Sequence, residues 1–274
     1  MIRWNGHEIK PFVTRFPDNS QQVWNLPHDA HRHLELHEIV WNYESDEELM
    51  LIHQLVTYIR EHSKHGIHLV MPFMPYGRQD KPVRNDACFG LHAFLQALPR
   101  VEKVTTLDCH NPKPISEFFG KLRASGGHFT VFEDLPIDFE GLFAMVPGAY
   151  SMLPDRGCAV RLSKKLKDRN VTVYVADKVR NQQTGRIEKI EIQQGTFYPD
   201  VSDLQGKDVL VIDDICDGGG TFIMLAEEVL KYKPKTLTLY VTHGIFSKGL
   251  DVLKEAGYTS VISTNKDMEL ERVY

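Results

Sequence analysis

Two adjacent carboxylates and three consecutive glycines follow an apolar stretch in the second half of the chain. Asp213 and Asp214 come directly after the β-branched stretch 209–212, and neighbouring carboxylates can accept hydrogen bonds from the vicinal hydroxyls of a sugar. The glycines let main-chain N–H groups approach an anion, and the helix predicted from residue 222 adds the positive end of its dipole. The segment 213–221 therefore predicts a site for a phosphorylated sugar.

Seven residues make up this predicted site: Asp213, Asp214, Asp217, Gly218, Gly219, Gly220 and Thr221. The carboxylates of the first two suit a ribose, and the residues from Gly218 onward suit a phosphate. A tight glycine turn capped by Asp217 or Thr221 is the purely structural alternative. We favour the ligand site because two acids, three glycines and a threonine in one strand-to-helix connection are more specific than a lone glycine pair.

Cationic segments follow two other predicted strands. Four polar residues come after the apolar run 68–74, namely Arg78, Gln79, Asp80 and Lys81. An arginine can bind a phosphate or stack on a base, and a lysine offers a point charge. Lys178 and Arg180 follow the run 171–176 in a polar segment, 177–186, which predicts a mobile loop. On an extended chain two cations at this spacing face the same way and can grip phosphates, although an exposed basic hairpin is the alternative.

The elements that must position these residues form an α/β pattern. Apolar runs bounded by polar turns predict buried parallel strands at 68–74, 104–107, 171–176, 209–212, 236–241 and 260–263. Apolar periodicity predicts helices at 47–60, 91–98, 160–166, 221–231 and 249–256. Such alternation is typical of doubly wound sheets, in which ligands bind at the carboxyl ends of the strands. We expect two domains, 1–138 and 139–274.

At the segment 213–221 the sequence resembles the type I phosphoribosyl-binding motif, and further segments resemble the ribose-phosphate pyrophosphokinases. These segments are 72–81, 107–112 with 117–119, 154–161 and 242–247. The resemblance implies two doubly wound parallel-sheet domains of the type I phosphoribosyltransferase-like fold. It implies that Arg78, Gln79, Asp80 and Lys81 bind ATP together with Phe16 and Asp18. It also implies that the Lys-x-Arg pair, Lys178 and Arg180, closes over the transition state.

The resemblance further implies an Mg²⁺ ion bound by Asp155 and His110. Asp155 is a hard oxygen ligand of the kind that Mg²⁺ prefers, whereas a histidine is a poor Mg²⁺ ligand, so His110 is assigned by the resemblance alone. The implied enzyme transfers diphosphate from ATP to the anomeric hydroxyl of ribose 5-phosphate. The implied assembly is a homo-oligomer in which the segment 16–20 completes a neighbour's ATP site.

The sequence departs from the family at several positions, as a short, divergent, phage-type member would. We expect the stretch before Phe16 to be too short to supply the first strand and helix that most members carry, and the end at Tyr274 to leave no room for their last helix. Segment 83–90 lacks the family's Arg-Ala-Pro pattern. Gly218 stands where most members have a threonine, and the space so freed could admit a larger acceptor. ADP-ribose, which phage-encoded relatives pyrophosphorylate for NAD synthesis, is therefore the alternative acceptor.

The residues present disfavour two other classes of protein. A non-catalytic regulatory homologue would not need Lys178, Arg180, His110 and Asp155, and a phosphoribosyltransferase proper would not need the loop at Arg78. The net charge of −5 and pI near 6.2 give no basic surface for nucleic acid. No apolar run approaches the ~20 residues of a membrane helix. The four scattered cysteines indicate reduced thiols, and we expect a cytoplasmic protein.

Overall fold

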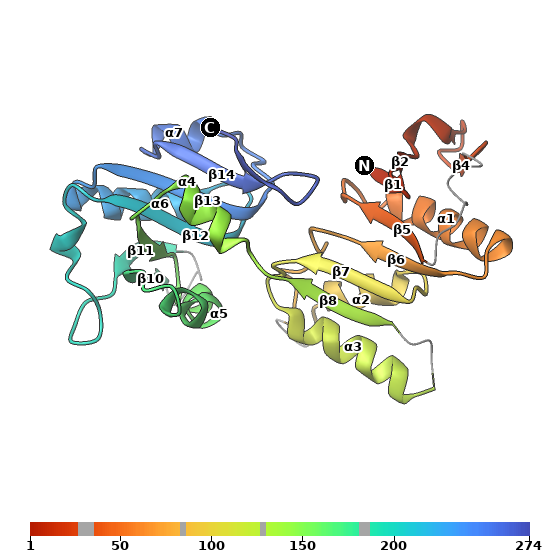
Figure 1. Ribbon diagram of the computed structural model, residues 1–274, viewed down its shortest axis with the longest axis horizontal. Helices are drawn as coiled ribbons and strands as arrows, with labels where there is room; N and C mark the ends of the chain where they lie inside the picture. The colour runs from red at the N-terminus through yellow and green to blue at the C-terminus, as the bar shows by residue number, and fades with distance from the viewer. Residues whose placement is uncertain (27–35, 83–85, 127–129, 181–186) are drawn as a thin grey trace. The chain divides into compact units, whose positions relative to one another are not determined.

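The computed structural model describes residues 1–26, 36–82, 86–126, 130–180 and 187–274, drawn in Figure 1. The chain divides into two compact units, Met1–Pro136 and Ile137–Tyr274. The division falls two residues before the domain boundary expected from the sequence. Each unit carries its own sheet.

The N-terminal unit is built on a six-stranded sheet with the order β2-β1-β5-β6-β7-β8. Four strands are parallel and follow one another in sequence order: β5 (Leu36–Trp41), β6 (Gly66–Val70), β7 (Lys103–Leu107) and β8 (Val131–Leu135). The strand β1 (Ile2–Trp4) runs antiparallel to β5 and continues into β2 (His7–Glu8). Trp4 and Trp41 are fully buried, so the N-terminal stretch does supply a core strand.

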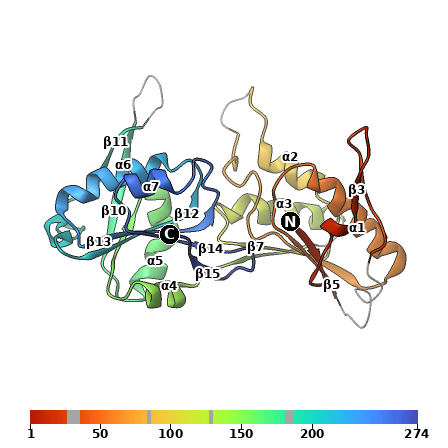
Figure 2. The same ribbon diagram turned by 90° about the horizontal axis from the view of Figure 1, so that it is seen from above.

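Helices α1 (Glu48–His62), α2 (Gly90–Ala97) and α3 (Pro112–Ala124) cover one face of this sheet (Figure 2). The helix α1 buries one apolar stripe, formed by Leu51, Ile52, Leu55, Val56 and Ile59. A short helical turn, Lys10–Phe12, leads into a separate hairpin of β3 (Val13–Arg15) and β4 (Gln21–Val23).

The C-terminal unit holds a seven-stranded sheet with the order β11-β10-β9-β12-β13-β14-β15. Its parallel centre consists of β10 (Val173–Arg180), β9 (Tyr150–Leu153), β12 (Asp208–Cys216), β13 (Thr236–Gly244) and β14 (Ser260–Thr264). The antiparallel edges are β11 (Ile187–Ile192) and β15 (Leu270–Arg272). The strand order reverses at β9, as it does in a doubly wound sheet.

Helices therefore cover both faces of this second sheet. Figure 2 shows α6 (Gly220–Val229) and α7 (Asp251–Glu255) on one face, and α4 (Phe139–Met145) and α5 (Arg156–Lys167) on the other. Short helical turns at Val201–Leu204 and Leu230–Tyr232 flank β12 and α6. In the part of the chain that the structure describes, no helix is long and apolar enough to cross a membrane.

The strands and helices predicted from the sequence are all present, but two predicted loops are wrong in part. Lys178 and Arg180 lie on β10, because this strand pairs with β11 up to Arg180, and only 181–186 of the predicted loop falls outside the described residues. Asp213 and Asp214 lie within β12, which pairs with β13 as far as Cys216. The connection before α6 is therefore only Asp217 to Gly219.

Candidate active site

The carboxyl end of β12 holds two acidic side chains against one arginine. Arg161 on α5 places Nη2 3.6 Å from Asp213 Oδ1 and 3.7 Å from Asp214 Oδ1. Asp214 is buried, and both the Asp213 and the Arg161 side chains are less than one fifth exposed. The pair of carboxylates can remain together at a strand end because the guanidinium, which is always protonated, balances their charge.

Burial and the charge of Asp214 raise the pKa of the Asp213 carboxyl well above its ordinary value, and the Arg161 charge offsets only part of this rise. The main-chain N–H of Asp214 donates to Asp213 Oδ1 at 3.0 Å and fixes the side chain. The strand end is thus a desolvated, hydrogen-bond-accepting surface. Such a surface suits hydroxyl donors of a neutral sugar ring better than a second anion.

The turn after β12 leads to a helix end that no side chain caps. Gly219, the N-cap of α6, has a left-handed φ of 75° and provides no side chain, and neither Asp217 nor Thr221 takes the capping role. A side chain at Gly219 would also approach Leu253 of α7 to 3.3 Å, whereas no described atom lies within 4 Å of the Cβ position of Gly220. The capped-turn alternative is therefore wrong, because the N-terminus of α6 has no side-chain cap, and a helix end of this kind can bind an anion.

Asp155 and Lys178 form an ion pair at the carboxyl ends of β9 and β10. Asp155 Oδ1 accepts the Cys158 N–H at 2.9 Å and so caps α5, while Oδ2 accepts from Lys178 Nζ at 2.6 Å. Burial alone would raise the pKa of Asp155, but the hydrogen bonds from Lys178 and Cys158 outweigh it and lower the pKa. The residue predicted to bind metal and a residue predicted to be catalytic are thus in direct contact.

A second ion pair lies beside the first. Arg156 Nε is 2.8 Å from Asp177 Oδ2, and Asp177 Oδ1 accepts the N–H of Lys178 at 3.0 Å. Two neighbouring ion pairs, Asp155–Lys178 and Arg156–Asp177, therefore join the start of α5 to β10. Together they hold Lys178 beside Asp155. The pairing of β10 with β11 shifts between Val179 and Arg180, so the strand alternation is irregular where the second predicted cation stands. The Arg180 side chain lies outside the described part of the chain.

In the N-terminal unit, the predicted ATP loop follows β6 and packs on the start of α2. Tyr76 has a left-handed φ of 60°, and its hydroxyl donates to Asp46 at 2.6 Å. The Gln79 amide occupies the space where a side chain at Gly90 would begin, so Gly90 is required for this arrangement. Arg78 and Lys81 are exposed, and neither forms an ion pair with the described residues. Their charges remain available to a ligand.

The loop of the predicted metal histidine contacts this ATP loop. Asn111, which caps α3, donates from Nδ2 to Asp80 Oδ2 at 2.7 Å, and His110 is exposed beside it. His110 belongs to the N-terminal unit and Asp155 to the C-terminal unit. Among the described residues no group of three or more acidic, histidine or cysteine side chains could hold a metal. Mg²⁺ commonly binds through one or two carboxylates and the substrate's phosphates, so Asp155 fits an ion that arrives with a nucleotide.

Phe16 and Asp18 lie at the tip of the β3–β4 hairpin. Asp18 Oδ1 accepts from the Ser20 hydroxyl at 2.7 Å and from the Ser20 N–H at 2.9 Å, and these bonds lower the pKa of Asp18. The Phe16 ring is partly exposed. The hairpin thus presents a fixed turn with an aromatic ring and a carboxylate.

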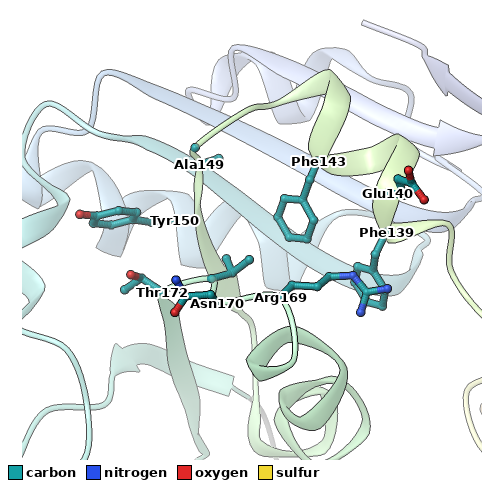
Figure 3. Close-up of a pocket in the computed structure, with 10 residues that line it drawn as sticks. Phe139, Glu140, Phe143, Ala149, Tyr150, Arg169, Asn170 and Thr172 are labelled. Atoms are coloured by element: carbon teal, nitrogen blue, oxygen red, sulfur yellow. The ribbon is translucent and has the colours of Figure 1, made fainter.

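A hollow of about 620 Å³ opens at the other end of the C-terminal sheet (Figure 3). Phe143 and Tyr150 face it together with Arg169, whose guanidinium lies 4.9 Å from the Phe139 ring centroid. Thr172 lies just before β10 and Tyr150 begins β9, so the hollow is at the amino ends of the strands. None of the residues predicted from the sequence lines it.

One residue near the predicted phosphate site had no signal in the sequence analysis. Lys248, in the segment after β13, lays its side chain against Gly218, with Cε 3.4 Å from the position of a Cβ there. Arg161 was likewise given no role. Paired carboxylates at a strand end call for a neighbouring cation. Arg161, however, precedes Asp213 by more than fifty residues, so no local sequence pattern links the two.

Comparison with known proteins agrees with this geometry. Residues 154–271 match the phosphoribosyl transferase domain model. The ribose-phosphate pyrophosphokinases of Saccharolobus solfataricus and Thermococcus kodakarensis are 25% and 28% identical over 82% and 76% of this chain, which cover 73% and 69% of those proteins. That of Agrobacterium fabrum is 29% identical over 76% of the chain and 63% of its own length.

Among solved structures, the phosphoribosylpyrophosphate synthetase of Mycobacterium smegmatis superposes with a TM-score of 0.71 at 20% identity, covering 93% of this chain and 79% of that one. This likeness shows the fold. Taken together, these comparisons show that residues 154–271 form a phosphoribosyl transferase domain and that the chain, on a type I phosphoribosyltransferase-like fold, is a divergent sequence similar to the ribose-phosphate pyrophosphokinases.

Proposed function

We propose that this enzyme transfers the β,γ-diphosphate of ATP to the C1 hydroxyl of ribose 5-phosphate, giving 5-phosphoribosyl 1-diphosphate and AMP. One observation carries the proposal: paired carboxylates at the end of β12 lie one short turn before the uncapped N-terminus of α6. The carboxylates that would bind the sugar and the helix N-terminus that would bind the phosphate are therefore only a few residues apart, as the binding of one sugar phosphate requires. The names of the relatives support the same reaction.

The acceptor is bound by the strand end and by the helix end. Asp213 and Asp214 accept hydrogen bonds from the ribose 2- and 3-hydroxyls, and the main chain of 218–221 binds the 5-phosphate through N–H groups. Asp217 precedes the glycines, and Thr221 offers a hydroxyl in the first turn of α6. The desolvated Asp213 gains hydrogen-bond donors when the sugar binds.

The donor is bound by the ATP loop. Arg78 and Lys81 contact phosphates, while Gln79 and Asp80 fix the loop through Gly90 and Asn111. Phe16 and Asp18 at the hairpin tip contribute to an ATP site of a neighbouring subunit in a homo-oligomer, as the resemblance implies. An Mg²⁺ ion bound with ATP would neutralise charge on the phosphate oxygens, and Asp155 and His110 are its proposed ligands.

In the reaction the C1 oxygen forms a bond to the β-phosphorus, and the bond from that phosphorus to the bridging oxygen of AMP breaks. The hydroxyl proton passes to solvent. Lys178, Arg180 and Arg78 stabilise the negative charge on the transferred group. In the ligand-free protein Lys178 is neutralised by Asp155, so a competing cation on this carboxylate would free the ammonium for the phosphates.

ADP-ribose as acceptor depended on free space beside Gly218. The side chain of Lys248 borders that space and narrows it, so this argument is weaker than the sequence suggested. A regulatory homologue without activity is disfavoured because Lys178 and Asp155 are held together at the strand ends rather than replaced.

The test is a single assay. Purified protein with ATP and Mg²⁺ is given ribose 5-phosphate or ADP-ribose in parallel, and AMP is measured, with a no-acceptor reaction as background. We expect AMP above background with ribose 5-phosphate. AMP formation only with ADP-ribose would change the acceptor, and none with either would overturn the proposed function.

A further inference from the structure

The segment after β13 is folded back onto the glycine turn by its own main chain. The N–H groups of Ile245 and Phe246 both donate to the carbonyl of Cys216, at 2.9 and 3.1 Å. Phe246 and Gly249 have left-handed φ values of 48° and 75°, and Gly249 N–H closes a turn on the carbonyl of Phe246 at 2.8 Å. This turn sets the position of Lys248.

Lys248 lies over Gly218 as a consequence. Its Cε, Cδ and Cγ are 3.4, 3.5 and 3.7 Å from the point where a side chain at Gly218 would begin. These are ordinary van der Waals distances, so the lysine's methylene groups border the position of the absent side chain. Lys248 is exposed and forms no ion pair or side-chain hydrogen bond with the residues that the structure describes. Its ammonium group is therefore an unpaired positive charge beside this turn, which also carries the exposed carboxylate of Asp217.

The neighbouring positions leave room for an anion. A Cβ at Gly220 would meet no described atom within 4 Å, and no side chain caps α6. A phosphate monoester carries a charge of about −1.5 to −2 at neutral pH. N–H dipoles alone balance part of this charge, and a lysine is a common partner for the rest.

We propose that Lys248 is a specificity-determining residue that binds the 5-phosphate of the acceptor and replaces the hydroxyl side chain absent at Gly218. This inference rests on the proposed function. The phosphate lies between the N–H groups of the α6 N-terminus and the Lys248 ammonium, and the lysine's methylene groups form the wall of the pocket beside Gly218. The acceptor class is a terminal sugar phosphate, which a dianion-binding cation favours over unphosphorylated ribose.

The experiment measures how Lys248→Met changes the use of ribose 5-phosphate. Methionine keeps the length of the side chain and removes its charge. We expect KM for ribose 5-phosphate to rise at least about tenfold, with KM for ATP and kcat at saturating acceptor within about twofold of wild type. Lys248→Arg should restore most of the affinity because it restores the cation. Lys235→Met, at the opposite end of the β12–β13 pair, is the matched control.

A second pair of variants tests the shared space. Gly218→Thr alone would push Lys248 away and raise the same KM. In Gly218→Thr/Lys248→Ala the new hydroxyl has room, so the two effects should be less than additive. Strict additivity would contradict the proposed contact.

Calorimetric binding of ribose 5-phosphate keeps the inference separate from the reaction. If the wild type makes no AMP, the proposed function fails, yet at least tenfold weaker binding of ribose 5-phosphate to Lys248→Met, with Lys235→Met unchanged, would still support the phosphate contact. Unchanged binding and unchanged KM in Lys248→Met would overturn it, whatever the activity of the wild type.

Discussion

Lys178 Nζ lies 2.6 Å from Asp155 Oδ2, which joins the end of β10 to the cap of α5. The ion pair is partly shielded, with the lysine side chain 17% exposed and the carboxylate 31% exposed. A carboxylate oxygen that holds an ammonium binds a metal less readily, because the two cations compete for it. The contact therefore couples the proposed metal ligand to the proposed catalytic cation.

Replacing Lys178 with alanine should lower kcat by about 100-fold or more, because a cation aimed at transition-state charge is lost. Binding should change little, so thermal stabilisation by ATP and ribose 5-phosphate should persist. Lys189→Ala is a matched control, since Lys189 is an exposed lysine on β11 that pairs with Glu191. If ligand-induced stabilisation fell as far as the rate, Lys178 would be a binding residue instead.

The same ion pair predicts how stability depends on pH. The folded-state pKa of Asp155 is below its ordinary value of 3.8, so the pair's contribution is complete above that value and is lost as pH falls through the folded pKa. Asp155→Asn keeps an acceptor for the cap and removes the charge. Its melting temperature should be lower than the wild type's at pH 7, and the gap should narrow below about pH 4. A gap that stays constant down to pH 3 would show that the charge adds no stability.

The regular part of the fold was predictable because its strands are continuous apolar runs. The run 209–212 is an example, and its residues are fully or almost fully buried in β12. Strands that bury polar side chains were missed. In β5 the polar residue His37 is fully buried and interrupts the alternation of apolar and polar residues. The strand β9 contains the buried Ser151.

The site was predictable only where its chemistry is local in the sequence. Asp213 to Thr221 form one segment, and the type of each residue indicates its use. The polar residues around Lys178 predict a loop, yet its pairing with Ile190 of β11 makes it part of a strand. The contacts made by Arg161 and Lys248 depend on crossovers and a left-handed turn, which spacing does not encode.

Gly90→Ala should impair ATP binding without much loss of stability. The new methyl group would take the place of the Gln79 amide, and a flexible exposed side chain can move at little cost. If Gln79 helps to fix the ATP loop, KM for ATP should rise several-fold, with KM for the acceptor unchanged.

The control for this variant is Gly120→Ala. No described atom lies within 4 Å of the Cβ position of Gly120 in α3, so this change should stabilise the helix by about 0.5–1 kcal/mol and leave both KM values as they are. If the Gly90→Ala variant had a normal KM for ATP, Gln79 would not contribute to ATP binding.

Asp213→Asn should make the protein more stable and less active. Burial and the neighbouring Asp214 raise the folded-state pKa of Asp213, so the wild type loses stability as pH rises from the unfolded value near 3.8 through the raised folded value. Asparagine removes that loss while Arg161 still pairs with Asp214. The melting temperature of the variant should therefore exceed the wild type's at pH 7, and the difference should shrink toward pH 4.

Activity should move in the opposite direction, because an amide is a weaker acceptor for the ribose hydroxyls than a carboxylate. We expect kcat/KM for ribose 5-phosphate to fall at least about tenfold, while KM for ATP is kept. Asp203→Asn, at an exposed position in the same unit, should change neither property. A variant that loses both stability and activity would mean that Asp213 holds the fold together through Arg161. In that case the carboxylates at the end of β12 would serve to stabilise the fold rather than to bind the sugar.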